Sequence, residues 1–186
     1  MARAMQKLTL DHPRLGTLHC DDGCLWEGHI TLPGFGRHGW SDELQIQIYV
    51  EDEGPPDPRA LALLEPLVAN AAALPDLIVD ALWNELSGGE AENGHWWARP
   101  GGLETVNEGL DEPITKRDDL WRVLQPDALF VREDVHGDGQ LTAGVAFACD
   151  FEEEHGLDVL TDGTRVLGTG YALDAEKYAR FAKPKR

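Results

Sequence analysis

The stretch from Gly144 to Tyr171 constrains the fold of this 186-residue chain more than any other part. From Leu141 to Cys149, hydrophobic residues alternate with smaller or polar ones, the period expected of a strand with one buried face. Further on, Asp162-Gly163 separates two β-prone runs, LDVL and TRVLG. This placement predicts a hairpin with a type I′ turn, because that turn needs a positive φ at both central positions. The C-terminal part should therefore be a group of antiparallel strands.

A dense acidic segment with the sequence DFEEEHG connects the first two of these strands. Its polar members are residue types used in acid–base catalysis and in binding divalent cations, namely Asp150, Glu152, Glu153, Glu154 and His155. Repulsion among crowded carboxylates raises the proton affinity of some of them. A structural role explains the same residues, since such side chains bond to turn backbone and Gly156 can adopt a left-handed conformation. Contact with a partner is a third interpretation. Catalysis would also need a nucleophile, a cleft or an oxyanion site, and none can be identified.

The N-terminal half changes from strand-like to helix-like spacing. Short strands are expected in the first fifty residues, ending with the alternating run from Leu44 to Val50. From Pro58 the apolar spacing becomes three and four residues, which predicts a helix with Asp57 as its N-cap. A second helix opens at Leu74-Pro75. A third, short helix begins near Thr115 with a capping box that uses Asp118, and ends at Pro126.

We expect one domain over residues 1–186, because this length supports a single substantial core. The predicted segments are an N-terminal meander over 6–52, a helical segment over 57–87, a long loop over 88–114, a short helix over 115–125, a C-terminal meander over 128–172 and a tail over 173–186. The fold class is α+β, with the two meanders joined in one antiparallel sheet and two to four helices packed on it.

The charge of the chain is strongly unbalanced, with 34 acidic and 16 basic residues and a formal net charge of −18. Such a field repels phosphate backbones and anionic lipid, so we expect no direct binding to nucleic acid or membrane. It attracts basic proteins or cations, although acidic charge also serves solubility alone. No apolar run reaches the ~18 residues of a membrane-spanning helix. Three cysteines argue against a disulfide scaffold, and a reducing bacterial-type cytoplasm is the expected location.

Two further groups of residues resemble metal sites. Cys20 and Cys24, with His19 and His29 nearby, suggest zinc, but the C-x₃-C spacing lies within one hairpin and has no second pair. The run from Asp134 to Gly139 begins like a calcium loop, yet its twelfth position is Val145 in a strand, where a carboxylate is needed. Apolar side chains beside a turn explain the first group, and a hairpin turn explains the second.

The paired tryptophans in His95-Trp96-Trp97 also have two interpretations. Trp96 and Trp97 could anchor a partner, because tryptophan dominates interface hot spots. They could instead fold over the sheet and complete the core, which we favour because exposed paired tryptophans promote association. No nucleotide-binding, hydrolase or zinc-protease motif occurs in the sequence, and we expect no cofactor.

The segment CDFEEEHGLDVL, with the following Asp-Gly turn and VLGTGY, resembles an uncharacterised bacterial domain family with a C-terminal Glu-His-Gly-Leu hairpin motif. The segments 25–35 and 61–70 are similar too, so the resemblance spans most of the chain. Phe151 stands where a tryptophan is common in such sequences. Members of this family are found near toxin and immunity loci, which implies an inhibitory role. The resemblance implies no active-site residues.

We therefore expect a non-enzymatic acidic binding protein, of the immunity type, that masks a basic partner such as a toxin. The contact residues would be Asp150, Glu152, Glu153, Glu154, His155, Trp96 and Trp97. One alternative is a metal-dependent hydrolase that uses Glu152, Glu154 and His155. Another is a structural module within a larger assembly.

Overall fold

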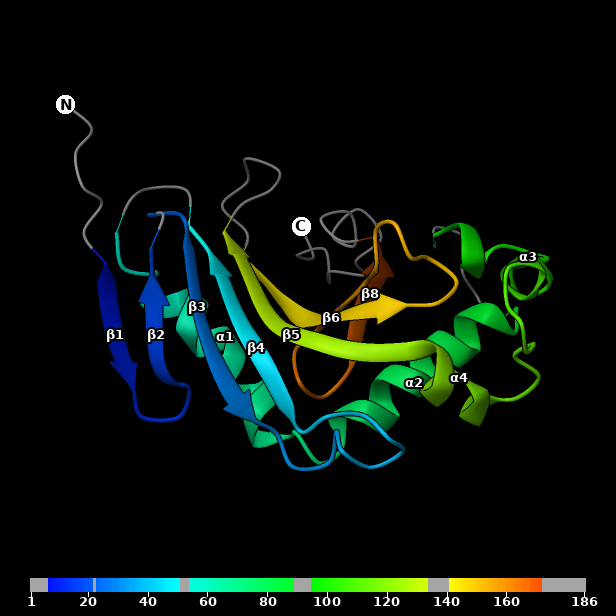
Figure 1. The fold of residues 1–186 in the computed structure, drawn as a ribbon, viewed down its shortest axis with the longest axis horizontal. Coiled ribbons are helices and arrows are strands. Elements are labelled where there is room, and N and C mark those ends of the chain that lie inside the picture. Colours follow the sequence, from blue (N-terminus) through cyan, green and yellow to red (C-terminus); the bar gives the residue numbers. More distant parts are fainter. Residues whose placement is uncertain (1–6, 22, 51–53, 89–94, 134–140, 172–186) are drawn as a thin grey trace, which may run out of the picture.

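The computed structural model describes residues 7–21, 23–50, 54–88, 95–133 and 141–171, and its strands form one eight-stranded sheet (Figure 1). The strands are β1 (Leu8–His12), β2 (Gly16–Cys20), β3 (Leu25–Thr31), β4 (Glu43–Tyr49), β5 (Leu124–Glu133), β6 (Leu141–Cys149), β7 (Leu157–Thr161) and β8 (Val166–Gly170). Their order in the sheet is their order in the chain. The predicted α+β class is confirmed.

One pair of neighbouring strands departs from the predicted antiparallel arrangement. β4 and β5 run parallel, with Ile46 opposite Leu129 and Ile48 opposite Val131. All other neighbours are antiparallel, so β1–β4 and β5–β8 are two meanders joined by one parallel pairing. The expectation of a purely antiparallel sheet is wrong at this pairing. The segment between β4 and β5 holds every helix of the described residues, and such a crossover brings the chain back to start the next strand in the same direction.

The helices lie in this crossover and pack on one face of the sheet. They are α1 (Pro58–Ala69), α2 (Leu74–Leu86), α3 (Gly102–Glu108) and α4 (Leu120–Val123), with 3₁₀ turns η1 (Trp96–Ala98) and η2 (Arg117–Asp119). As predicted, Pro58 is the first residue of α1, and the carboxylate of Asp57 accepts a hydrogen bond of 2.7 Å from the Arg59 amide. No single described helix can cross a membrane; α1 and α2 together have the length and composition, but they meet at 92°.

Three expectations about the segments around the crossover need correction. The predicted loop over 88–114 contains η1 and α3, whose amphipathic spacing is too short to recognise in the sequence. The helix predicted over 115–125 covers only 117–123, and Pro126 lies inside β5, where the register shifts between Pro126 and Ala128. A strand tolerates proline at such an irregularity. The predicted turn at 136–139 and the tail over 173–186 lie outside the described residues.

The hairpin between β7 and β8 forms where Asp162-Gly163 predicts it, but with a different turn. Gly163 has a φ of +84°, whereas Asp162 is not among the described residues with positive φ, so the turn is not type I′. The carboxylate of Asp162 instead accepts hydrogen bonds from the amides of Thr164 and Arg165, at 2.9 and 3.0 Å. These bonds close a four-residue connection, because an aspartate side chain can replace a backbone acceptor.

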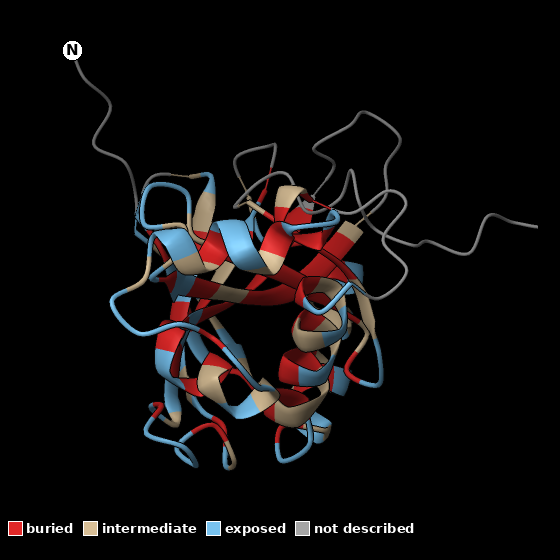
Figure 2. Ribbon diagram, turned by 90° about the vertical axis from the view of Figure 1, so that its right-hand side faces the viewer, coloured by how far each residue is buried: buried red, intermediate tan, exposed pale blue. Residues whose placement is uncertain are grey.

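The main core lies between the helices and one face of the sheet (Figure 2). The strands contribute the alternating residues that the sequence pattern indicates, such as Ile46, Ile48, Val145 and Val159. Leu64 and Leu67 of α1 and Ile78 and Leu82 of α2 face them, together with Trp97. The buried apolar side chains of both helices thus form part of a protein core.

The opposite face of β5–β8 contains a second, smaller buried group. Phe130 and Leu160 are fully buried there, and Arg132 and Asp158 lie beside them as an ion pair with an N···O distance of 2.6 Å. The side chains of Arg132 and Asp158 are 6% and 1% exposed. The Arg132 guanidinium also stacks 4.2 Å from the Phe130 ring centre. The pair joins β5 to β7 across β6, so it fixes the register of three strands.

Replacing Asp158 with alanine should leave the Arg132 charge buried without this carboxylate, which costs roughly 3–5 kcal/mol in comparable buried pairs. Urea unfolding of the full chain measures the change. Glu112→Ala is the matched control, because its ion pair with Arg122 is largely exposed and should contribute less than about 1 kcal/mol. Equal losses in the two variants would contradict the structural role of the buried pair.

Candidate functional site

The two candidate contact regions of the sequence meet at one end of the sheet. The 3₁₀ turn η1 places Trp97 against Phe151 of the β6–β7 connection, with ring centres 5.9 Å apart. Tyr171, which follows β8, lies 5.9 Å from Trp97 and stacks 4.8 Å from His155. A stretch near residue 96 and the acidic segment near residue 152 thus form one aromatic cluster, a juxtaposition that the sequence did not indicate.

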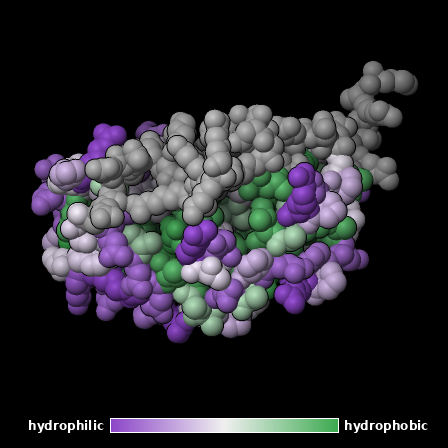
Figure 3. Space-filling view, turned by 180° about the vertical axis from the view of Figure 1, so that it is seen from behind, coloured by the Kyte–Doolittle hydropathy of each residue, from purple (hydrophilic) through white to green (hydrophobic). Residues whose placement is uncertain are grey.

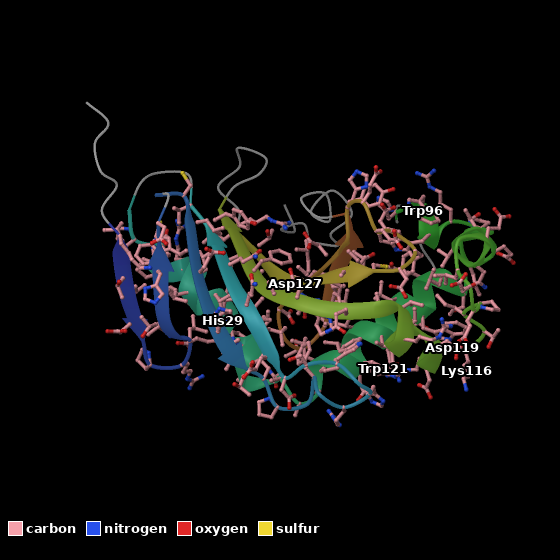
Figure 4. The ribbon with its side chains drawn as sticks, in the orientation of Figure 1. His29, Trp96, Lys116, Asp119, Trp121 and Asp127 are labelled. Atoms are coloured by element: carbon pink, nitrogen blue, oxygen red, sulfur yellow. The ribbon has the colours of Figure 1, made fainter. Side chains whose placement is uncertain are left out.

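One part of the aromatic cluster is buried, and the other part is partly accessible to solvent. Trp97 and His95 are buried, so the expected core closure is confirmed for them. Trp96 is only half-buried, and Figure 4 places it at the end of the molecule that carries α3. Phe151 and Tyr171 are also half-buried. Aromatic rings with one protected side and one accessible side suit a contact surface, because they offer apolar area at little cost in side-chain entropy.

Glu85 of α2 holds this cluster in place through hydrogen bonds. The sequence did not indicate this residue as a candidate. Its carboxylate accepts hydrogen bonds from the Trp97 indole at 3.3 Å and from the Thr169 hydroxyl of β8 at 2.6 Å. It therefore links α2, η1 and β8. Its position directly before the buried Leu86, on the apolar side of α2, is the only signal in the sequence that could have pointed to it.

The acidic segment is an ordered turn whose backbone bonds determine its shape. The Asp150 amide donates to the Val123 carbonyl at 2.9 Å, and the Gly156 amide donates to the Glu152 carbonyl at 3.0 Å. Glu152 and His155 are in contact at 2.9 Å, with side-chain exposures of 13% and 53%. This arrangement supports the structural interpretation for these two residues. Asp150, Glu153 and Glu154 project into solvent, and none of them forms an ion pair with another described residue.

The residues proposed for hydrolysis are only partly brought together. Glu152 and His155 touch, but Glu154 is exposed and, within the described residues, no three His, Cys, Asp or Glu side chains are grouped as metal ligands. Burial, the largest cause, and the charges of Asp150 and Glu152 together raise the pKa of the nearby Cys149 to about 12, so its thiol stays protonated at neutral pH. The turn therefore holds the Glu152 carboxylate and the His155 imidazole in contact, but no activated nucleophile lies beside them among the described residues.

The zinc candidates are spread over the other half of the sheet. Cys20 is buried and accepts a hydrogen bond from the Gly23 amide at 3.1 Å, whereas Cys24 is exposed. His19 and His29 are exposed on β2 and β3, and Figure 4 shows His29 far from Trp96. The calcium candidate over 134–139 lies outside the described residues.

Residues 95–123 and 150–156 together form what we call the acidic end. Figure 1 shows α3, α4 and the β6–β7 connection gathered there, and Figure 3 shows mostly hydrophilic side chains on the same end, at its left. The acidic end contains ten carboxylates, Glu104, Glu108, Asp111, Glu112, Asp118, Asp119, Asp150, Glu152, Glu153 and Glu154. It contains four cations, Arg99, Lys116, Arg117 and Arg122, which leaves a formal charge of −6.

Two of these cations are already engaged by carboxylates. Arg117 pairs with Asp76 at 2.7 Å, with Asp80 and with Asp118 at 3.1 Å, and so ties η2 to α2. Partial burial acts to lower the pKa of Arg117, but hydrogen bonds to the three carboxylates outweigh it, so the pKa is raised and the charge is permanent. Arg122 pairs with Glu112 at 3.4 Å. The cations of this end are therefore partly used to hold the helices in place.

The segment before α4 begins with an aspartate turn, one residue later than predicted. Asp119, and not Asp118, accepts hydrogen bonds from the Thr115 amide at 2.8 Å, the Thr115 hydroxyl at 2.9 Å and the Lys116 amide at 3.1 Å. These bonds lower the pKa of Asp119 below its ordinary value, with the Thr115 amide as the largest cause. Figure 4 shows Asp119 and Lys116 together at the outer edge of this end.

Fold and site together define an acidic α+β sheet protein with an aromatic cluster at its acidic end. Residues 14–175 match the domain of unknown function DUF6985, and the protein belongs to this family. No curated protein and no solved structure matches the chain. The expected membership of a domain family of unknown function is confirmed, whereas the link to toxin and immunity loci and the Glu-His-Gly-Leu motif as a family mark stay predictions.

The β6–β7 turn should be sensitive to a side chain at Gly156. This residue has a φ of +62°, and an added Cβ would lie 2.8 Å from the Phe147 carbonyl oxygen. Gly156→Val should therefore lower the free energy of unfolding by about 1 kcal/mol or more through backbone strain. Thermal melting measures the effect. Gly109→Ala is the control, since the nearest atom would be 3.8 Å away, and an unchanged midpoint for Gly156→Val would show that the turn has another conformation.

Asp119 should make the acidic end sensitive to low pH. Because its pKa in the folded protein is lowered from about 3.8, its contribution to stability is complete above that value and is lost as pH falls through the lowered folded pKa. Asp119→Asn should thus lose less stability than the wild type between pH about 5 and about 2. Urea unfolding across this range tests it. Glu108→Gln, a change at an exposed carboxyl of α3, should follow the wild-type pH profile; a wild-type profile for Asp119→Asn would contradict the assignment.

Proposed function

We propose that this protein is a non-enzymatic binding protein that docks through its acidic end onto a basic surface of another protein. The single observation that carries the proposal is that Asp150, Glu153 and Glu154 share one turn with the half-buried Phe151, whose ring lies 5.9 Å from that of Trp97. Trp97 in turn contacts the half-buried Trp96, with ring centres 5.7 Å apart. Negative charge and accessible aromatic area on one surface suit lysine and arginine side chains. Arginine in particular pairs with carboxylates and stacks on aromatic rings.

The charges of the acidic end favour a partner contact over internal stabilisation. Arg117 and Arg122 are engaged with nearby carboxylates, whereas Asp150, Glu153 and Glu154 form no ion pair with described residues. Solvated carboxylates that crowd at one end raise the electrostatic energy of the folded chain through mutual repulsion. A basic partner would relieve this repulsion on binding and would be attracted over a distance of about the Debye length.

The aromatic cluster supplies what exposed charge alone lacks. Surface ion pairs between mobile side chains contribute little free energy, and affinity at interfaces comes from a few large side chains at protected positions. Trp96 is held in place by the buried Trp97, which is itself fixed by Glu85. Trp96 is therefore the preorganised anchor, and the β6–β7 turn, which contacts Trp97 through Phe151, supplies the charged residues of the same end.

The nature of the partner follows from the charge and from the resemblance described above. A net charge of −18 suits an inhibitor that covers a strongly basic protein, as immunity proteins do with basic toxins. Three cysteines in 186 residues are too few for a disulfide scaffold, which suits a reducing cytoplasm. We therefore infer an immunity-type inhibitor in the cytoplasm, with a toxin-like protein as its partner.

The test is a pull-down in which the immobilised protein meets the product of a neighbouring reading frame at low salt. We expect retention of a basic protein, with an association rate that falls about tenfold or more as salt is raised from about 0.1 M to about 1 M. Trp96→Ala should weaken the complex by about 2 kcal/mol or more, as at other hot spots. Stopped-flow fluorescence gives the association rate, and calorimetry gives the affinity.

A matched pair of charge variants separates the acidic end from overall charge. Glu153→Lys with Glu154→Lys should slow association strongly. Glu27→Lys with Glu43→Lys changes the net charge equally, on exposed positions of β3 and β4, and should have a much smaller effect. Equal effects of the two double variants, an association rate that ignores salt, or no retained basic partner would refute the proposal.

A further inference from the structure

The first strand of the sheet presents an open edge. β1 pairs with β2 on one side only, and no other described strand lies along its outer edge. At the other edge, Gly168, Thr169 and Gly170 of β8 are buried. In β1, Thr9 and Asp11 are exposed and Leu8 and Leu10 are only half-buried. An edge strand with free backbone groups and accessible apolar side chains is a template for another strand.

We propose that the partner on this edge is a second copy of the chain, whose β1 pairs antiparallel with the first β1 around a twofold axis at Thr9. Opposite residues in such a pair have numbers that add to 18, which places Leu8 opposite Leu10, Thr9 opposite Thr9 and Lys7 opposite Asp11 of the other copy. Residues directly opposite in an antiparallel pair share a face of the sheet. Both leucine contacts thus lie on the core face, and both Lys–Asp contacts lie on the exposed face.

Charge complementarity selects this occupant over an unrelated strand. A lysine beside an edge strand usually opposes edge-to-edge pairing, because it must be placed next to another backbone without a counter-charge. In the self-pairing, each Lys7 lies opposite an Asp11 of the other copy. Lys7 therefore favours pairing with a second copy and disfavours pairing with an unrelated strand that has no carboxylate at that position. Lys7 pairs with Asp21 at 3.4 Å, but the two side chains are 61% and 70% exposed. Such an exposed ion pair contributes little free energy, so Lys7 can exchange it for a contact with Asp11 of the other copy. Asp11 is exposed and accepts a hydrogen bond from the Thr17 hydroxyl at 2.7 Å.

The position of the edge in the molecule favours the same pairing. Among the described residues 7–21, Lys7 and Arg14 balance Asp11 and Asp21, so this region is locally neutral in a chain of charge −18. β1 and the acidic end lie at opposite ends of the molecule (Figure 1). Two copies joined at β1 therefore keep their acidic ends as far apart as the sheet allows. Both acidic ends also stay open to solvent.

The expected dimer is weak and exchanges with monomer. β1 has five residues, and a single pair of such strands buries less than the roughly 1,200 Å² of a stable interface. Its population should therefore rise with protein concentration. Because the edge and the acidic end share no residue, this proposal does not depend on the proposed function, and either one can fail alone.

The experiment is sedimentation velocity on the full chain over a wide range of protein concentrations, with a charge swap at the edge. Lys7→Asp and Asp11→Lys each replace the two opposite-charge contacts of the dimer with two like-charge contacts. Each single variant should raise the dissociation constant by about tenfold or more. The double variant Lys7→Asp with Asp11→Lys restores opposite charges in the reverse order and should restore dimerisation. Glu27→Lys changes net charge as Asp11→Lys does, two strands away from the edge, and should leave the dimer intact.

Three results would overturn the proposal. The first is a chain that stays monomeric at all concentrations. The second is a dimer that neither single variant weakens, which would place the contact elsewhere. The third is a double variant no better than the single ones, which would mean that the substitutions act by disturbing β1. Thermal melting of each variant identifies this last case, because a disturbed β1 lowers the melting temperature whereas a lost dimer contact leaves the monomer intact.

Discussion

The parallel pairing of β4 with β5 is the constraint on which the rest of this structure depends. It joins two antiparallel meanders into one sheet, and it requires the intervening chain to return across a face of the sheet before β5 can begin. Ile46 and Ile48 of β4 and Leu129 and Val131 of β5 share that face, so α1 and α2 must cover it. The crossover also passes the far end of β6 and β7, where it leaves η1 and α3. The crossover that this pairing requires is what brings Trp97 of η1 next to Phe151 of the β6–β7 connection.

The two faces of the sheet are stabilised by different means. One face is covered by helices and holds the main apolar core, whereas the other buries the Arg132–Asp158 pair beside Phe130 and Leu160. A buried ion pair adds little net stability compared with apolar side chains of the same size, but it is costly to break. Its value is therefore in specifying register, since a slip of one residue would separate Arg132 from Asp158. The β5–β7 part of the sheet consequently provides a fixed base for the turn that carries the acidic residues.

Local patterns in the sequence predict most of the strands and the first two helices. The alternation from Leu44 to Val50 and the Asp57-Pro58 helix start depend only on neighbouring residues, so periodicity and capping suffice to find them. The failures concern tertiary structure. Pro126 is expected to end a helix, yet it lies in β5, at a shift of register between Pro126 and Ala128 that accommodates it. Asp162-Gly163 predicts the hairpin but not its turn type, because the Asp162 side chain replaces backbone acceptors.

In the candidate site, the sequence indicates the residue types but not the contacts between them. The residue types were recognisable, since both the acidic segment and the paired tryptophans stand out from the rest of the chain. Their contact was not, because Trp97 and Phe151 are separated by the end of the crossover and two strands. Glu85 could not be identified for a related reason. The role of a carboxylate within an apolar helix can be assigned only when its hydrogen-bond partners, Trp97 and Thr169, are known.

The order of the strands gives the charge distribution its spatial form. The sheet runs from β1 to β8 in chain order, with β1 at one end of the molecule and the connection that follows β6 toward the other end, near α3 (Figure 1). The balanced charges of residues 7–21 therefore stay at one end. The acidic segment after β6 is carried to the other end, where the crossover adds the carboxylates of α3 and of the segment before α4. A chain of −18 thus has a charge-balanced region at β1 and an excess of carboxylates at the acidic end. The fold itself keeps these two surfaces apart, since any contact at β1 is separated from the β6–β7 turn by the width of the sheet.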